Sequence, residues 1–588
     1  MNGKLKKTAT CLLWTAVACA AMAPQTGYAQ KRVGGDLIID ASDFLDEIPR
    51  LHLVQDAASL KTDWLYNNFA IKFRTHASFT VSNYMKTLTM PEDGPYYLYV
   101  RAVGGESGNF RIRIDDAYVE GAFGDKPGVA EMKNAGRFDF RKGQDVHLMV
   151  TRITGTPALD VIVFSKNPAL TEADLMDKQL PDDVVLLKEY DIPASGCVKF
   201  GDLTGDGKTD FVVMTPGYSS YAYDNAGKKL WHWEAPEERT KLRAEFEAPG
   251  AVWDFDRDGR AELVQWREFD GKEWLVIADG RTGRIKAKTP WPTKEHPHVY
   301  NNFRIAIANF NGKYPDVVVV YSDCGGEATI AAYDKKLNRL WAHVEHTKKD
   351  HLGHYVYPHD FDGDGIDEVL GGWVLLDSKG HEIWNRLPDI YDNHDHVDSY
   401  KFADMDGDGR EEIVVAACDL GSQVREAMTG KLLWVSPSEH NQQIQVGRFL
   451  DGYDLPQVAA GARIYKDRKV DPYLSGQVYW FDHKGELISK WPANGLNGNP
   501  DFSVGDWFGN GTQTLFWYKF LMQRDGRGKL YFTGNVYHCF DFERNGAAQV
   551  ITLDRGKLRV WGYKHVVAKT PNDDPDFVRQ TMTNHTHY

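Results

Sequence analysis

The chain has 588 residues, carries a formal net charge of −14 at neutral pH, and is 42% hydrophobic. This composition supports a large folded core and excludes a wholly disordered or collagen-like chain. The acidic balance gives no overall attraction for nucleic acid, and no apolar run after residue 29 approaches the length of a bilayer span. We therefore expect a multi-domain globular protein without a nucleic-acid partner or a membrane span. The sequence leaves its oligomeric state open.

The first 29 residues have the features of an export signal. Three lysines, at positions 4, 6 and 7, precede an apolar stretch from Cys11 to Met22, and Gly27-Tyr28-Ala29 offers small residues for cleavage. We predict a signal peptide over residues 1–29 and a periplasmic or extracellular protein. Lipoprotein anchoring through Cys19, in Ala16-Val17-Ala18-Cys19, is the weaker alternative. The remaining cysteines form no CxxC pair, which indicates buried thiols or at most two disulfides of open pairing: Cys197, Cys324, Cys418 and Cys539.

Residues 36–166 alternate apolar and polar side chains in short runs, most clearly at 96–102 and 110–114, with glycines between the runs. This pattern predicts an antiparallel β-sandwich. The segment resembles the jelly-roll accessory modules of carbohydrate-active enzymes, and the resemblance implies an accessory, carbohydrate-binding domain. The polar, acidic stretch 167–183 is the predicted linker.

An internal repeat fills the rest of the chain. A D-x-D-x-D-G type of loop precedes an apolar strand at Asp202, Asp254, Asp360 and Asp404, and less complete copies begin at positions 309, 448, 506 and 541. The spacing suits one four-stranded propeller blade per repeat. We predict an all-β chain in which the sandwich is followed by an eight-bladed β-propeller over residues 184–568. Residues 184–187 are expected to close the ring, and 569–588 to form a polar C-terminal tail.

The repeated loops carry carboxylates at alternate positions around a glycine turn. Hard oxygen ligands at this spacing favour calcium over zinc or copper. Calcium is therefore the predicted cofactor, in a structural role. Its predicted ligands are Asp202, Asp206, Asp210, Asp254, Asp256, Asp258, Glu262, Asp360, Asp362, Asp364, Glu368, Asp404, Asp406, Asp408 and Glu412.

Histidines gather before two successive Asp loops. Three lie at 351, 354 and 359 and two at 394 and 396. Loops at equivalent places in neighbouring blades face the same side of a propeller, so these imidazoles are expected to converge; the alternative is that each has a structural role. Arg448 stands where the sixth repeat has lost its first Asp. Its guanidinium is shaped to receive a carboxylate bidentately, and the alternative is a local salt bridge.

From 352 to 449 the order of motifs resembles the eight-bladed rhamnogalacturonan lyases. The motifs are Gly353-His354, then His396-Val397-Asp398, the hairpin from Arg425 to Trp434, and Gly447-Arg448. The resemblance implies a secreted polysaccharide lyase that cleaves a uronate-containing polysaccharide or oligosaccharide by β-elimination. Arg448 is then expected to hold the uronate, His354 or His396 to act as base, and Asp398 and His394 to bind substrate.

Three departures from the family pattern leave the substrate open. Phe449 follows Arg448 where the family has Gly, residues 395–398 read Asp-His-Val-Asp instead of Gly-His-Gly-Asp, and a Gly-Thr-Lys segment is not found in the last repeats. A rhamnosyl-glucuronate lyase would have the same features. A glycosidase, which needs two opposed carboxylates, and a non-catalytic, calcium-stabilised integrin-like binding propeller are competing interpretations. Convergence of His354, His396 and Arg448 in one pocket is expected only of the lyase.

Overall fold

The protein is described by a computed structural model. The structure describes residues 32–33, 35–41, 43–44, 51–54, 60–62, 65–66, 70–73, 82–176, 183–193, 197–215, 218–236, 250–293, 303–323, 327–346, 353–387, 396–450, 452–464, 476–492, 502–517, 520–522, 528–554 and 556–585. The predicted signal peptide, His351, His394 and Cys324 lie outside these residues.

The N-terminal strands form two antiparallel sheets that share one core, in agreement with an all-β segment. The larger sheet contains β1 (Arg32–Val33), β2 (Asp36–Asp40), β3 (Leu51–Val54), β4 (Ala70–Phe73), β6 (Gly94–Val103), β9 (Ala130–Phe140) and β11 (Ala158–Ser165). The smaller contains β5 (Ser82–Thr89), β7 (Gly108–Ile114), β8 (Ala117–Tyr118) and β10 (Asp145–Gly155). Leu98 and Val100 of one sheet pack in the same buried cluster as Ile112 and Leu148 of the other. The alternation at 110–114 thus separates core-facing from outward-facing side chains, whereas residues 98–102 of β6 are buried on both faces of the strand.

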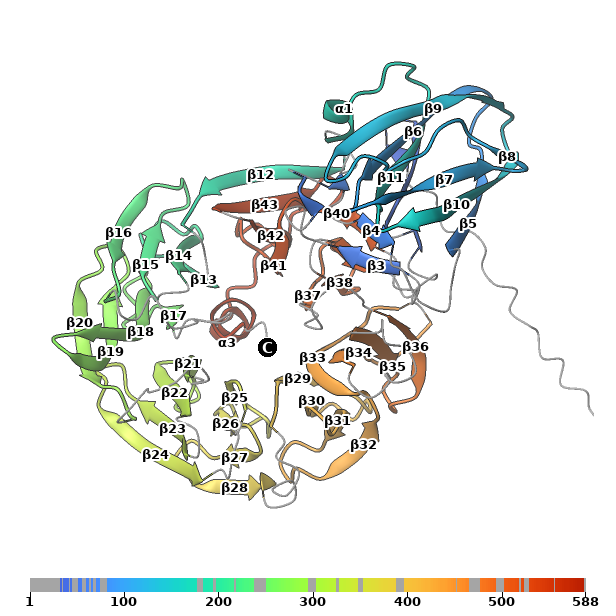
Figure 1. Ribbon diagram of the computed structural model, residues 1–588. Coiled ribbons are helices and arrows are strands. Elements are labelled where there is room, and N and C mark those ends of the chain that lie inside the picture. The colour runs from blue at the N-terminus through green and yellow to red at the C-terminus, as the bar shows by residue number, and fades with distance from the viewer. Residues whose placement is uncertain are drawn as a thin grey trace, which may run out of the picture.

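The other strands of the described residues form eight four-stranded antiparallel sheets, which follow one another around a ring in chain order (Figure 1). The first four are β13 (Cys197–Gly201), β14 (Asp210–Met214), β15 (Ser220–Tyr223), β16 (Lys229–Trp233); β17 (Gly250–Trp253), β18 (Glu262–Phe269), β19 (Lys272–Asp279), β20 (Ile285–Pro290); β21 (Phe303–Ala308), β22 (Val317–Asp323), β23 (Glu327–Tyr333), β24 (Arg339–His346); and β25 (Val356–His359), β26 (Glu368–Gly371), β27 (Val374–Leu376), β28 (Glu382–Asn385). The next three are β29 (Ser399–Ala403), β30 (Glu412–Ala416), β31 (Ser422–Arg425), β32 (Leu432–Ser436); β33 (His440–Gly447), β34 (Gln457–Arg463), β35 (Gly476–Phe481), β36 (Leu487–Pro492); and β37 (Phe502–Gly505), β38 (Thr514–Trp517), β39 (Phe520–Met522), β40 (Gly528–Tyr531).

The eighth sheet joins the two ends of the repeat region. It contains β41 (Asn535–Phe540), β42 (Gln549–Asp554), β43 (Lys557–Tyr563) and β12 (Val184–Asp191). Val184 pairs with Tyr563 and Asp191 with Lys557, so a strand from the start of the repeats completes the last sheet. The prediction that residues 184–187 close the ring is confirmed by this pairing.

Tryptophans on the outer strands connect each sheet to the next through a hydrogen bond and a packing contact. The Trp341 indole nitrogen donates a hydrogen bond of 2.9 Å to the carbonyl of Ser378 in the hairpin of the next sheet. Gly380 in that hairpin has φ +81°, and a Cβ added there would lie 2.6 Å from the Trp341 ring. Only glycine therefore fits both the positive φ and the contact, which explains why a turn glycine and a tryptophan recur together in the repeats.

The C-terminal segment, expected to be a polar tail, instead folds inside the ring. Helix α3 (Pro575–Val578) continues into η7 (Arg579–Thr583), and Figure 1 shows α3 near the ring centre. The Asn584 side chain accepts from the backbone nitrogen of Ile307 and donates to its carbonyl, at 2.9 and 2.8 Å. Thr583 donates to the Val252 carbonyl at 3.0 Å. Innermost strands leave backbone groups without a strand partner, and these polar side chains satisfy them.

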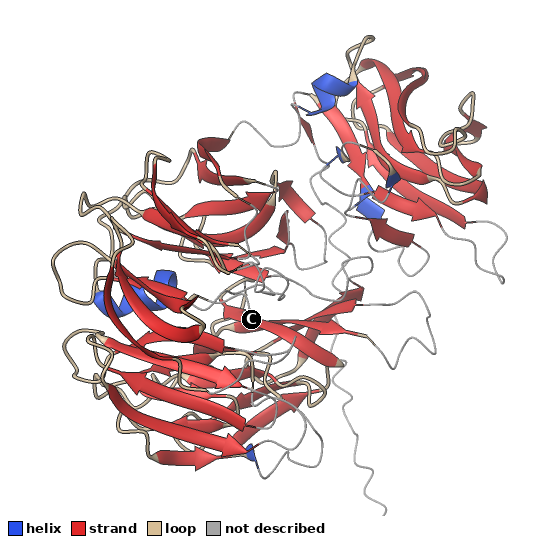
Figure 2. Cartoon of the chain, turned by 60° about the vertical axis from the view of Figure 1, so that its left-hand side comes forward, coloured by secondary structure: helices blue, strands red, loops and turns tan. Residues whose placement is uncertain are grey.

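The predicted linker also has structure, because α1 (Glu172–Met176) follows the sandwich and its Leu175 is buried in a cluster with Tyr99. The sandwich lies beside the ring in both views (Figures 1 and 2). Its core cluster extends to Trp480 and Trp517 of the adjoining sheets. The described cysteines, at 197, 418 and 539, are buried thiols that form no disulfide with one another. Within the described part of the chain, no helix is long and apolar enough to cross a membrane.

Candidate active site

The innermost strands of four consecutive sheets begin at the same end of the ring. His354 lies two residues before β25 and Asp398 directly precedes β29, whereas the Asp loops at 360 and 404 follow these strands. A parallel bridge between Gly353 and Val397 aligns the two strand starts. We call this the histidine end of the ring and the opposite one the Asp-loop end.

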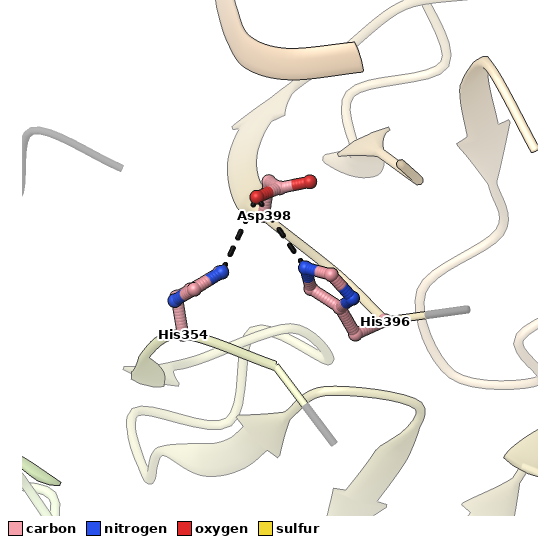
Figure 3. Close-up of side chains that lie close together, drawn as sticks. All are labelled: His354, His396 and Asp398. Carbon is pink, nitrogen blue, oxygen red and sulfur yellow. Dashed lines mark ion pairs between the residues drawn. The ribbon is translucent and has the colours of Figure 1, made fainter. Parts of the chain in front are cut away.

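Two histidines share one carboxylate at the histidine end. Asp398 Oδ1 lies 3.3 Å from His354 Nε2 and 3.6 Å from His396 Nε2, and both imidazoles point toward this oxygen in Figure 3. The centroids of the two imidazole rings are 5.1 Å apart, and the ring planes meet at an angle of 71°. The Asp398 side chain is only 1% exposed, whereas the histidines are 15% and 16% exposed. A buried carboxylate therefore holds two imidazoles that remain accessible to a ligand.

Backbone contacts fix this arrangement before any ligand binds. The His354 nitrogen donates to the Val397 carbonyl at 3.1 Å, and the Asp398 nitrogen donates to the Ala416 carbonyl at 3.0 Å. The Tyr321 hydroxyl donates to the Gly353 carbonyl at 2.9 Å. His354 and Asp398 thus stand on segments anchored to neighbouring strands, which limits the reorganisation needed on binding.

Burial and charge set the protonation of the cluster. Burial lowers the pKa of His354, and this effect outweighs the neighbouring Asp398 carboxylate, which raises it. Burial alone would raise the pKa of Asp398, but the two adjacent imidazoles reverse that effect and hold it below its usual range. At neutral pH His354 is therefore a neutral imidazole beside an ionised carboxylate, the state that a general base requires.

Arg304 and His440 extend the cluster and were not singled out from the sequence. Arg304 is the second residue of β21, is 7% exposed, and its charge lowers the pKa of His354. His440 begins β33, and one of its ring nitrogens lies within 4.8 Å of an Asp398 oxygen. A signal for His440 existed: it stands eight residues before the repeat at Arg448, as His396 stands eight before Asp404.

Arg448 does not join the histidines, and the expectation of one shared pocket is wrong. Strand β33 runs from His440 to Gly447, so Arg448 follows its far end. At about 3.3 Å per residue, this strand separates Arg448 from the histidine end by roughly 25 Å. The Arg448 backbone pairs with Gln513, to which its nitrogen donates at 2.8 Å, and its side chain is exposed. A residue that begins a repeat belongs to the Asp-loop end.

The Asp loops differ in how much of their negative charge remains uncompensated. In the loop at 360, ligand atoms of Asp360, Asp362 and Glu368 lie within 4.8 Å of one another. Burial, followed by repulsion from Asp362, Asp360 and Asp364, raises the pKa of Glu368 to about 7. This electrostatic conflict is what a divalent cation relieves, so the residues fit calcium.

Protein groups contact the predicted ligands of two other loops. Lys286 Nζ lies 2.7 Å from Asp256 and 2.7 Å from Glu262, and an ammonium there occupies the space between the predicted ligands. In the first loop both oxygens of Asp210 accept hydrogen bonds, from the Asn225 nitrogen at 2.7 Å and the Leu203 nitrogen at 2.9 Å. The loop at 254, which Lys286 partly neutralises, is therefore a weaker candidate for calcium than the loop at 360. In the first loop, burial and the Asp202 carboxylate still raise the pKa of Asp210 to about 6.

Comparison with known proteins gives the same family that the motifs suggested. Residues 265–499 match "Rhamnogalacturonan lyase family 11, C-terminal domain". The rhamnogalacturonan endolyase YesW of Bacillus subtilis (strain 168) is 23% identical over 398 residues, which cover 53% of this chain and 61% of that protein. The chain thus spans less than two thirds of that relative's length.

Two solved structures share the fold across nearly the whole chain. One is the exotype rhamnogalacturonan lyase YesX, with a TM-score of 0.50, 16% identity, and coverage of 92% of this chain and 95% of that one. The other is the Bacillus licheniformis rhamnogalacturonan lyase PL11, with a TM-score of 0.52, 15% identity and the same coverage of 92% and 95%. The predicted resemblance to rhamnogalacturonan lyases is confirmed by the family match.

Proposed function

The chain is a relative of the rhamnogalacturonan lyases, and from this relationship we propose that it is an exported polysaccharide lyase. Its substrate is a rhamnogalacturonan-like glycan, which it cleaves by β-elimination. The eight sheets are then the blades of a β-propeller over residues 184–568, closed by the pairing of β12 with β43. The sandwich at 36–166 is its accessory, carbohydrate-binding domain, joined through residues 167–183.

The His354–Asp398–His396 cluster is the observation that carries this proposal. β-Elimination removes the proton on the carbon next to the uronate carboxylate, after which the electron pair forms a carbon–carbon double bond as the 4-linked oxygen leaves. His354 takes the proton, because its neutral imidazole is accessible and Asp398 stabilises the imidazolium that forms. His396, on the other side of the same carboxylate, is placed to return a proton to the leaving oxygen.

Arg304 supplies the positive charge that the reaction needs. The negative charge that develops on the uronate carboxylate must be stabilised by a nearby cation, and Arg448 lies at the wrong end of the ring. Arg304 is the second residue of β21, the strand next to β25, and is close enough for its charge to affect His354. Its guanidinium is suited to bidentate binding of the substrate carboxylate.

Calcium binding at the Asp loops is the second part of the proposal. The uncompensated charge around Glu368 favours a cation in the loop at 360. The matching loop at 404 has the same framework, in which Asp404 accepts from Gly407 and Glu412 accepts from Met405. Bound calcium would neutralise the clustered carboxylates and hold the strand ends together, with no step of the elimination passing through it.

Mass analysis of the products tests the reaction class. The purified protein is incubated with rhamnogalacturonan and, as a control, with homogalacturonan. A lyase gives unsaturated oligosaccharides that are lighter by one water than the hydrolysis products of the same length. Saturated products would support a glycosidase, and an intact polymer that nevertheless binds the protein would support the binding propeller.

A further inference from the structure

Asp398 also faces a thiol and a third imidazole. Ligand atoms of Asp398, Cys418 and His440 all lie within 4.8 Å of one another. Cys418 follows β30 and His440 begins β33, so two neighbouring sheets contribute to the group. The Asn441 nitrogen donates to the Cys418 carbonyl at 2.9 Å, which holds the two segments side by side.

The thiol and the imidazole of this group are in direct contact. His440 Nδ1 lies 2.8 Å from Asp419 Oδ1, a contact that places the ring proton on Nδ1 and leaves the lone pair on Nε2. Nε2 in turn lies 3.6 Å from Cys418 Sγ, with Nδ1 closer to that sulfur at 3.1 Å. The sulfur is closer to Nδ1 than to Nε2, so a metal bound to Nε2 requires the Cys418 side chain to turn toward that nitrogen. In tetrahedral zinc, with bonds of about 2.0 Å to nitrogen and 2.3 Å to sulfur, two such ligands are separated by roughly 3.5 Å. A carboxylate on the outer nitrogen is a common orienting partner of metal-bound histidine.

The second Asp398 oxygen independently indicates a cation site. Oδ1 takes both ion pairs to His354 and His396, whereas buried Oδ2 has no hydrogen-bond partner among the described residues. Figure 3 shows this oxygen directed away from the two imidazoles. An uncompensated buried carboxylate oxygen is costly, and a cation removes that cost.

Backbone geometry at Cys418 is also unusual. Cys418 has φ +42°, a conformation that L-residues other than glycine rarely adopt. Strain of this kind persists only where the surroundings impose it, and it is concentrated at functional sites. The turn therefore holds the buried thiol against His440 at an energetic cost.

We propose that Cys418, His440 and Asp398 bind a thiophilic divalent metal ion of the zinc class. Sulfur and imidazole ligands favour such a metal over calcium, which prefers oxygen ligands. Binding displaces the thiol proton, so the site gains one metal ion and releases a proton to solvent. This inference goes beyond the proposed lyase activity and does not depend on it, although Asp398 belongs to both clusters.

Cobalt titration of the full-length, tag-free protein tests the proposal, because a thiolate bound to cobalt gives a charge-transfer band in the near ultraviolet. The wild-type protein is expected to show this band at one equivalent and to lose it when zinc, but not excess calcium, is added. Cys418→Ala should abolish the band and His440→Ala should weaken it. Cys539→Ala removes another buried thiol and should leave the band unchanged.

The result also separates this site from the lyase proposal. His354→Ala should retain the band whether or not the protein cleaves a glycan, since His354 is outside the thiol group. Circular dichroism establishes that each variant is folded. A wild-type protein without the band, a band that survives in Cys418→Ala, or displacement of cobalt by calcium would overturn the proposal.

Discussion

Nε2 of His354 lies 3.3 Å from the Asp398 carboxylate although 44 residues separate them in the sequence. Each stands six residues before the first Asp of its own repeat, His354 before Asp360 and Asp398 before Asp404. The repeat therefore places them at equivalent positions in neighbouring sheets, and the Gly353–Val397 bridge brings them into contact. The His354–Asp398 pair is therefore divided between two neighbouring sheets, and the ring fixes the position of each member.

The pH dependence of kcat/KM is expected to report the titration of His354. Its pKa is lowered by burial, and the base is active when deprotonated. Activity should therefore be constant at neutral pH and fall only below the ordinary histidine value of about 6.5. Asp398→Asn removes the carboxylate that raises this pKa, so the acid limb should move to still lower pH while kcat decreases. An unchanged limb in this variant would contradict the assignment of His354.

Replacement of Arg304 tests the position of the cation. Arg304→Met should lower kcat/KM by roughly 10²–10³-fold, as expected for loss of one group that stabilises developing negative charge. Arg304→Lys keeps the charge and should restore part of the rate. Arg410, an exposed residue of the Asp-loop end that pairs with Asp408, provides the control, and Arg410→Ala should have normal kinetics. Equal kinetics for all three variants would remove Arg304 from the site.

Calcium should stabilise the protein mainly through the loops whose charge is uncompensated. Because the pKa of Glu368 is raised to about 7, the metal-free loop is stable at low pH and loses stability as pH rises through that value. A chelator should therefore lower Tm more at pH values above 7 than below it. Calcium is expected to raise Tm because it binds the native state and not the unfolded chain.

Two aspartates give a matched comparison of the loops. Asp362→Asn should reduce the calcium-induced rise in Tm, because Asp362 belongs to the uncompensated group. Asp256→Asn should leave it nearly unchanged, because Lys286 already pairs with Asp256. A Tm indifferent to chelator and calcium in the wild-type protein would exclude calcium as a structural cofactor.

The C-terminal segment is expected to contribute strongly to stability. Arg579 pairs with Asp367 at 2.5 and 3.1 Å, and both side chains are 2% exposed. Arg579→Met leaves a buried carboxylate without its cation and should cost about 3–5 kcal/mol in the free energy of unfolding. The double variant Arg579→Met/Asp367→Asn should recover part of this loss. The control is Arg544→Ala, which breaks a more exposed ion pair with Asp573 and should cost less than about 1 kcal/mol in the free energy of unfolding. Equal decreases in Tm for Arg579→Met and Arg544→Ala would show that the C-terminal segment is not integral to the ring.

The sequence was sufficient to predict the sheets because their signals are local. Each Asp loop, strand and turn glycine recurs in the repeat, and even the closing strand at 184–187 could be located. Long-range contacts were not predictable in the same way. The capping of Ile307 by Asn584 joins residues 277 apart, and a polar segment gives no indication that its side chains will bond to exposed strand edges.

Site prediction failed where an analogy replaced the geometry of the repeat. His354 and His396 were singled out because they precede the Asp loops, and Asp398 entered through the family motif that contains His396. Arg448 was included through its resemblance to a family motif, although its own place at the start of a repeat puts it at the other end of β33. His440 could have been placed at the histidine end by its distance of eight residues from the start of the repeat at Arg448.

The most direct measurement is the initial rate of ultraviolet absorbance increase from unsaturated uronate, compared between His354→Ala and Arg448→Ala on rhamnogalacturonan. We predict that His354→Ala loses roughly 10²–10⁴-fold in kcat, as expected when a general base is removed, with a Tm close to that of the wild type. Arg448→Ala should retain normal turnover because its side chain is exposed at the Asp-loop end. Normal turnover in His354→Ala together with loss of turnover in Arg448→Ala would contradict the account and move the active site to the opposite end of the ring.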